Sequence, residues 1–144
     1  MSNVRRYPVV IAAALLLGSF LLTVPLAHAA TPTCHGLDAT IVGTSGADHL
    51  TGTSGNDVIV GRGGNDTIRG KGGNDTICGG AGDDQLFGQG GSDFVSGGAA
   101  NDSLSGGTGK DDLNGGSGTD SIDGGGGKDN CNGGENDNGC EGGD

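Results

Sequence analysis

Ten aspartates stand nine residues apart along most of this chain of 144 residues. Each follows a glycine-rich stretch and comes two residues before an apolar or cysteine side chain. Carboxylates are hard oxygen donors, so carboxylates at a fixed spacing favour the binding of cations. The ten are Asp48, Asp57, Asp66, Asp75, Asp84, Asp93, Asp102, Asp111, Asp120 and Asp129.

The aspartates belong to a nine-residue repeat that begins at Gly43 and runs without a slip to residue 132. Position one is glycine in all ten units, and position four is glycine in every unit except the one that contains Ala100. Position six is the aspartate, and position eight is apolar or cysteine throughout. Disordered sequence of low complexity does not keep four columns in register for so long, so the repeat predicts an ordered structure.

Each column has a structural meaning. The glycines permit positive φ and predict a turn, and the last three residues of a unit predict a minimal strand with position eight pointing inward. Two units make one coil of eighteen residues, and the coils stack as parallel strands about 4.8 Å apart. We therefore expect an all-β fold, a right-handed parallel β-roll (β-solenoid) of about ten nonapeptide repeats.

Units such as residues 61–69 and 79–87 resemble the RTX nonapeptide, G-G-x-G-x-D-x-U-x, and the resemblance covers residues 43–132. It implies a β-roll in which calcium ions lie between successive turns. The implied ligands are the position-six carboxylates and backbone carbonyls of the glycine turns. Ligands that are all oxygen suit Ca²⁺ better than zinc or copper, and the octahedral shell of Mg²⁺ is harder to build from such turns.

The roll divides the aspartates between two edges, and ions between neighbours on one edge give roughly eight Ca²⁺ in all. Asp48, Asp66, Asp84, Asp102 and Asp120 share one edge, and the other five share the opposite edge. Because the predicted core is thin and glycine loses much entropy on folding, we expect the calcium-free chain to be largely unfolded.

Several units depart from the pattern. Ala100 replaces a turn glycine, which predicts strained or weak sites around it. Thr44 and Thr53 stand at position two of the first two units and predict stiffer turns. Residues 30–42 read as an N-terminal capping segment with Ile41 inward, and residues 133–144 as a degenerate C-terminal cap without a calcium site.

Four cysteines in an exported chain favour disulfides. Cys131 and Cys140 are nine residues apart and both in the inward column, which predicts a bond between them. Cys78 faces outward beside an apolar stripe that we define as Val42, Val58, Val60 and Phe94. If residues 31–37 fold over this apolar stripe, Cys34 bonds Cys78; otherwise these two thiols are free.

Residues 1–29 read as a signal peptide, with Arg5 and Arg6 before an apolar run and Ala27-His28-Ala29 at its end. An uncleaved membrane anchor is the alternative. The remaining chain, residues 30–144, keeps all 18 acidic residues and five basic ones, a formal charge of −13. Such a chain repels nucleic acid and anionic membranes, so we expect neither as a partner after cleavage.

These features predict a secreted, extracellular calcium-binding repeat protein with a structural or interaction role. A calcium-dependent adhesin or surface-binding module is the alternative. Outside the repeats no stretch is long enough for a catalytic domain, so we expect no enzyme activity. A monomer is expected, and a protein or glycan partner stays open.

Overall fold

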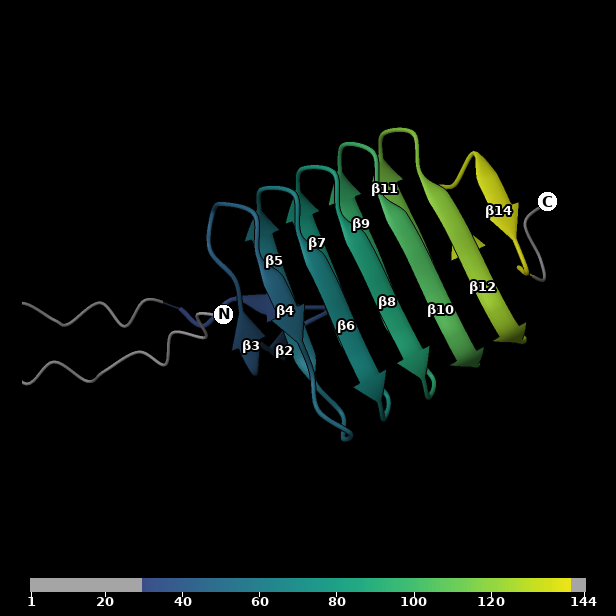
Figure 1. Cartoon of the computed structure of the whole chain (residues 1–144), viewed down its shortest axis with the longest axis horizontal. Coiled ribbons are helices and arrows are strands. Elements are labelled where there is room, and N and C mark those ends of the chain that lie inside the picture. The colour runs from purple at the N-terminus through teal and green to yellow at the C-terminus, as the bar shows by residue number, and fades with distance from the viewer. Residues whose placement is uncertain (1–29, 141–144) are drawn as a thin grey trace, which may run out of the picture.

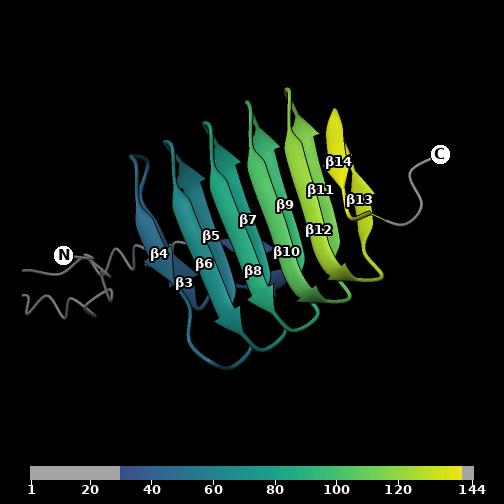
Figure 2. The same cartoon turned by 45° about the vertical axis from the view of Figure 1, so that its right-hand side comes forward.

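The computed structural model describes residues 30–140. The predicted signal segment and the last four residues of the predicted C-terminal cap lie outside this range. Two six-stranded parallel sheets stack face to face and form a β-solenoid of about five coils, which confirms the expected all-β parallel architecture (Figures 1 and 2). One sheet consists of β3 (Ile41–Val42), β5 (Val58–Gly63), β7 (Thr76–Ala81), β9 (Phe94–Ala99), β11 (Asp112–Ser117) and β13 (Asn130–Asn132). The other consists of β4 (His49–Thr51), β6 (Thr67–Gly72), β8 (Gln85–Gly90), β10 (Ser103–Gly109), β12 (Ser121–Gly127) and β14 (Asn136–Asn138).

The strands are longer than the predicted three residues. Eight of the twelve have six or seven residues, because each of these continues from positions seven to nine of one unit through at least positions one to three of the next. Strands β5 and β7 pair in steps of eighteen residues at Val60 and Cys78 and again at Arg62 and Gly80, with position one left out of the register. The prediction of minimal strands was therefore wrong: the glycine positions extend the ladder beyond a local break.

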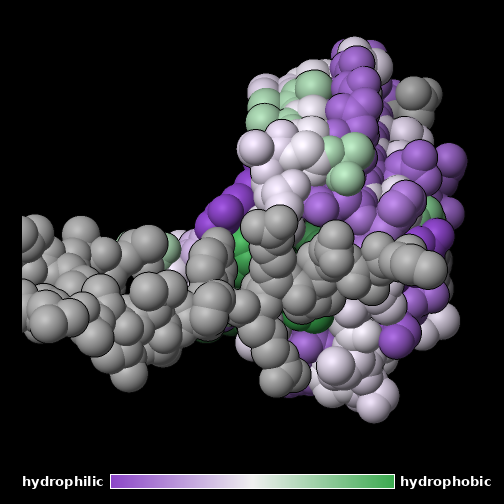
Figure 3. All heavy atoms as spheres, turned by 60° about the vertical axis from the view of Figure 1, so that its left-hand side comes forward, coloured by the Kyte–Doolittle hydropathy of each residue, from purple (hydrophilic) through white to green (hydrophobic). Residues whose placement is uncertain are grey.

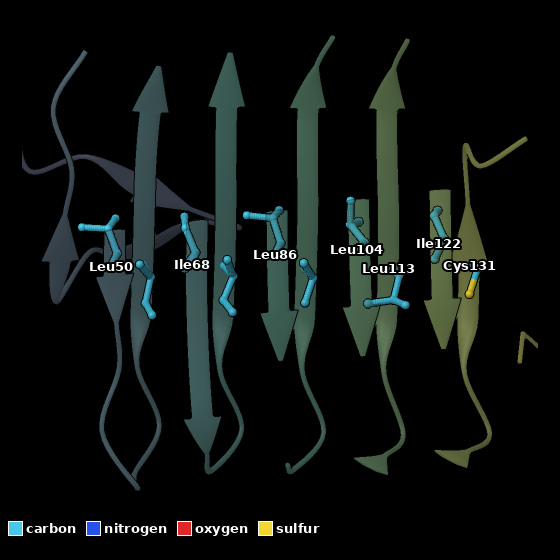
Figure 4. Packing of buried hydrophobic residues seen from close by; sticks show 10 residues of the cluster. Leu50, Ile68, Leu86, Leu104, Leu113, Ile122 and Cys131 are labelled. Atoms are coloured by element: carbon cyan, nitrogen blue, oxygen red, sulfur yellow. The ribbon is translucent and has the colours of Figure 1, made fainter. Parts of the chain in front are cut away.

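Position eight lines the inside of the solenoid, as predicted (Figure 4). Its side chains form one continuous column between the sheets, and Ile41 and Cys140 pack against its two ends. Eight of the ten have no more than 2 % of their surface exposed; the exceptions are Leu50 and Cys131 at the ends of the column, with 6 % and 8 %. Each coil thus contributes only two side chains to a narrow core.

A short antiparallel hairpin covers part of the outer face near the N-terminus. It joins β1 (Thr33–Cys34) to β2 (Leu37–Asp38) through His35 and Gly36, which both have the positive φ that a two-residue turn requires. β1 contacts β5 and β7, and Cys34 forms a disulfide with Cys78, with Cα atoms 5.8 Å apart. The predicted bond is confirmed.

The hairpin accounts for much of the apolar stripe. Val60 is buried beneath it, and the His35 ring lies 4.0 Å from the Phe94 ring between centroids. Leu37 at its tip stays 49 % exposed. The rest of the face seen in Figure 3 is largely hydrophilic, with apolar residues in small areas.

The C-terminal end is held by a second disulfide. Cys131 in β13 bonds Cys140, again with Cα atoms 5.8 Å apart, as the shared inward column predicted. The tail also adds β14 to the edge of β12, with Ile122 opposite Asp137. Residues 30–140 contain no helix that could cross a membrane.

Candidate metal centre

The position-six aspartates occupy equivalent places, each just before a strand begins at one of the two edges of the solenoid. Nine of the ten are buried, with at most 7 % of the residue surface exposed, and Asp48 at the first turn is partly buried. Aspartates on one edge are eighteen residues apart and lie in adjacent turns. The predicted division into two edges follows directly from the alternation of strands between the two sheets.

Consecutive aspartates on an edge are linked by hydrogen bonds. The backbone N–H of Asp66 donates to Oδ1 of Asp84, and the same bond recurs at each step from Asp48 to Asp129, with lengths of 2.8 to 3.0 Å. We call these two series the aspartate ladders. They fix the rotamer of each carboxylate and leave its other oxygen, Oδ2, pointing away from the ladder.

That second oxygen has no hydrogen-bond partner in eight of the ten units, although it is buried. A buried carboxylate oxygen without a partner is costly, because it has lost water and gained nothing in return. A cation or a proton would remove the cost. The eight residues are Asp66, Asp75, Asp84, Asp93, Asp102, Asp111, Asp120 and Asp129.

The same burial changes the acidity of these groups. Burial is the main cause that raises the pKa of Asp66 from 3.8 to about 6; the hydrogen bond from the Asp48 N–H opposes this, and the charges of Asp84 and Asp48 add to it. The pKa values of Asp93 and Asp102 also rise to about 6, with burial the largest cause. Burial likewise raises the pKa values of Asp75, Asp84 and Asp111.

Backbone carbonyls face the same oxygens. A Cβ atom built on Gly124 would lie 2.7 Å from the carbonyl oxygen of Gly139 and 2.9 Å from Oδ2 of Asp129, closer than a real Cβ comes. The position-one glycine of each of the first nine units is surrounded by its own aspartate and by the carbonyl of the glycine eighteen residues later, and Gly139 takes that place for the last unit. Position one must be glycine, because any side chain would enter this cluster of oxygens.

The donor set fits Ca²⁺. In the eight units with a free Oδ2, this carboxylate oxygen and a carbonyl oxygen converge, and no N–H or O–H group donates to Oδ2. Calcium takes oxygen ligands of both kinds with flexible geometry. Within residues 30–140 no three acidic, histidine or cysteine side chains meet at one point, so each centre would use one or two carboxylates and complete its shell with carbonyls.

The tail takes part in the last turns. The carbonyl of Gly133 lies beside the cluster of Asp120, and that of Gly139 lies beside the cluster of Asp129, in the places that position-one glycines occupy elsewhere. The tail was predicted to be a cap without a calcium site. It contributes carbonyl oxygens to the preceding units, while Asn138 replaces the aspartate that a further centre would need.

Ala100 retains the geometry of the glycine that it replaces. Its φ is +87°, in the left-handed region that a residue with a Cβ rarely adopts, and its N–H donates to the Ser117 carbonyl at 2.9 Å. The predicted strain is present, held in place by that hydrogen bond. A weakening of the nearby calcium sites stays a prediction.

Asp48 and Asp57 differ from the other eight. The Oδ2 atom of each accepts hydrogen bonds from the threonine at position two of the same unit, Thr44 or Thr53. All ten aspartates were predicted as ligands, with stiffer turns expected in the first two units. The structure therefore places all ten on the expected edges but leaves only eight with a free, buried oxygen.

Position five forms a further ladder that the repeat pattern did not predict. The Asn56 side-chain oxygen accepts the N–H of Asn74 at 2.7 Å, and Asn74 accepts that of Ser92 at 2.8 Å. Asn65, Asp83 and Asn101 act in the same way on the other edge. The signal was visible as asparagine or aspartate recurring directly before the position-six aspartate.

Comparison with known proteins agrees with this geometry. The family model for the RTX calcium-binding nonapeptide repeat (4 copies) matches residues 42–77, 69–104 and 105–139, well over half of the chain. No curated protein and no solved structure matches it. With the repeat, the parallel solenoid and the oxygen clusters in place, the chain belongs to the RTX calcium-binding nonapeptide repeat family.

Proposed function

We propose that this chain is a secreted protein that folds when Ca²⁺ binds between its stacked turns, and that it acts as a structural or interaction module. The observation that carries the proposal is the set of eight buried Oδ2 atoms without a partner. These atoms destabilise the metal-free roll at neutral pH, because they are buried without a partner and the stacked carboxylates repel one another. A divalent cation between two carboxylates attracts both and so replaces this repulsion by attraction.

The rest of the structure supports a coupling between binding and folding. The core is a single column with two side chains per coil, and much of the chain is glycine, which loses more backbone entropy on folding than other residues. A preformed site does not exist in an unfolded chain, so the free energy of binding becomes free energy of folding. We expect roughly eight ions at most, one for each free Oδ2.

Two disulfides support an extracellular location, because such bonds form and persist in oxidising compartments. The predicted signal segment agrees, although it lies outside the described residues. Extracellular calcium modules bind at about 10⁻⁴–10⁻³ M. With sites in that range, the chain would stay loose before export and fold outside the cell.

The test is a calcium titration of the disulfide-bonded chain, followed by circular dichroism and calorimetry. We expect a coil-like spectrum after removal of metal, a β-spectrum in calcium, and much weaker recovery with magnesium. A β-spectrum that is indifferent to removal of calcium would contradict the proposal and assign the stability to disulfides and hydrogen bonds.

The adhesin alternative stays a prediction. An adhesin could bind its partner through the apolar stripe. The β1–β2 hairpin of this chain, however, covers Val60 and packs His35 on Phe94, so part of the stripe is not available to a partner. A non-catalytic role agrees with the family match, because that match extends from residue 42 to residue 139. A pull-down with and without calcium would identify a protein or glycan partner.

A further inference from the structure

We infer that the first two turns of the roll are closed by threonine and not by calcium: hydrogen bonds from Thr44 and Thr53 satisfy the carboxylate oxygen that would otherwise bind the ion. The calcium sites are then confined to the units from Gly61 onward. The inference rests on the proposed calcium-dependent folding, since it assigns where along the repeat the ions bind. It removes Asp48 and Asp57 from the ligand set and gives Thr44 and Thr53 a role in their place.

The first turn supplies its own donors to the carboxylate. Oδ2 of Asp48 accepts the backbone N–H of Thr44 at 2.6 Å and its hydroxyl at 2.9 Å. The Thr44 hydroxyl oxygen in turn accepts the N–H of Gly46 at 3.2 Å. The oxygen that is free in later units is therefore satisfied twice over, and a cation there would have to displace both donors.

The second turn repeats the arrangement on the opposite edge. Oδ2 of Asp57 accepts the N–H of Thr53 at 2.6 Å and its hydroxyl at 2.9 Å, and the hydroxyl accepts the N–H of Gly55 at 3.1 Å. The two turns lie at opposite edges of the solenoid and share no residue. The same closure in both is a consequence of threonine at position two.

Backbone conformation separates these turns from all later ones. Position two has positive φ in each of units three to ten, from +78° at Gln89 to +121° at Gly80, but not at Thr44 or Thr53. Position four follows the same division, since Gly46 and Gly55 also lack positive φ. Threonine is β-branched and disfavours positive φ, so it keeps the peptide in the orientation that points its N–H at the carboxylate.

The place of these units in the repeat explains why they need another closure. Asp66 and the later aspartates each have an aspartate eighteen residues before them, whereas Ala30 and Ala39 occupy those places for Asp48 and Asp57. On the side that faces residues 30–39, a cation at the first turns would therefore find no second carboxylate. Hydrogen bonds from threonine do not neutralise the charge of the carboxylate, but they give Oδ2 hydrogen-bond partners without a metal ion.

The test counts bound ions in two matched double variants of the full disulfide-bonded chain. We expect Asp48→Asn/Asp57→Asn to bind as many Ca²⁺ per chain as the unaltered protein, measured by calorimetry and by metal analysis after dialysis. Asp84→Asn/Asp93→Asn, which changes one carboxylate on each edge in the middle of the roll, should bind at least two fewer. An equal loss of ions in both variants would overturn the inference.

A second pair of variants leaves all carboxylates in place. We expect Thr44→Val/Thr53→Val to keep the ion count but to lower the melting temperature in saturating calcium by several degrees, whereas Thr119→Val at an exposed turn position should leave it unchanged. Equal melting temperatures would refute the role of the threonines. If the unaltered chain binds no Ca²⁺, the proposed function fails, while the melting comparison still decides whether threonine closes the first turns.

Discussion

The backbone N–H of Asp66 donates to Oδ1 of Asp84 at 2.8 Å, while Oδ2 of Asp84 is buried without a partner. One oxygen of each such carboxylate thus holds two coils together, and the other is available to a cation. Structure and binding therefore depend on the same side chain. Removal of the carboxylate should affect both the stacking of coils and the affinity for calcium.

Acidification should stabilise the metal-free roll. The pKa values of Asp66, Asp93 and Asp102 rise to about 6 in the folded state from 3.8, so the folded state holds protons that the unfolded state has released between these values. Each group therefore contributes stability that is fully present below pH 3.8 and is lost as the pH rises through about 6.

We therefore expect the metal-free chain to show more β-structure near pH 4 than at pH 7, and the apparent affinity for calcium to fall as the pH drops below 6. Circular dichroism of calcium-free protein across this range measures the first effect, and calorimetry measures the second. A metal-free roll that becomes less folded on going from pH 7 to pH 4 would contradict the assignment of raised pKa values.

Gly106→Ala should disrupt one turn. The new Cβ would meet the Gly124 carbonyl at 2.7 Å and the carboxylate of Asp111, and neither belongs to a flexible surface group. We expect a loss of about 1–3 kcal/mol of stability in saturating calcium, together with weaker binding at that unit. Gly46→Ala is the matched control, because its Cβ would meet only the Thr44 hydroxyl at 3.9 Å and its φ is not positive. Similar melting temperatures for the two variants would disprove the crowding argument.

Ala100→Gly should stabilise the protein. Glycine adopts the φ of +87° without the penalty that a Cβ carries, so we expect a gain of about 1 kcal/mol in the free energy of unfolding. Ala99→Gly, at the neighbouring exposed position without positive φ, should be neutral or destabilising. Chemical denaturation in saturating calcium compares the two, and a loss of stability in Ala100→Gly would show that the turn is not strained.

The two disulfides should differ in their contribution. Cys34–Cys78 closes a loop with a sequence separation of 44, and Cys131–Cys140 one of 9. Chain entropy predicts losses of about 4 kcal/mol for Cys34→Ser/Cys78→Ser and about 2.5 kcal/mol for Cys131→Ser/Cys140→Ser. Denaturation curves of both variants in calcium give the comparison. The reverse order would mean that the C-terminal bond stabilises mainly by completing the last turn.

Much of the architecture followed from the nine-residue period. The period places Ile59 inside and Cys78 outside, and from there the two edges, the core column and both disulfides could be predicted. The hydrogen bonds of Thr44 could not be predicted, because they depend on whether the peptide before Thr44 directs its N–H or its carbonyl toward the carboxylate. Glycine allows either orientation, so the columns alone do not distinguish a turn that presents carbonyls from one that presents an N–H.

The position-five ladder was missed for a related reason. Asn74 is exposed and looks like an ordinary loop residue, and its role appears only when the next turn lies against it at a distance of 2.8 Å from the Ser92 N–H. The longer strands were missed because glycine disfavours strands in general. Here glycine extends the strands: adjacent turns approach too closely for a side chain, and only glycine lets their backbones continue to pair.

In a chain of near-identical units, the coils can stack in more than one register each time the chain folds. Coils displaced by eighteen residues would bury almost the same side chains and place aspartates at the same edges, so misaligned stacks compete closely with the native one. The bonds Cys34–Cys78 and Cys131–Cys140 are not repeated along the sequence, and each fixes one end of the roll to a unique partner. Once these bonds have formed, the protein can release calcium and bind it again without a shift in the register of its coils.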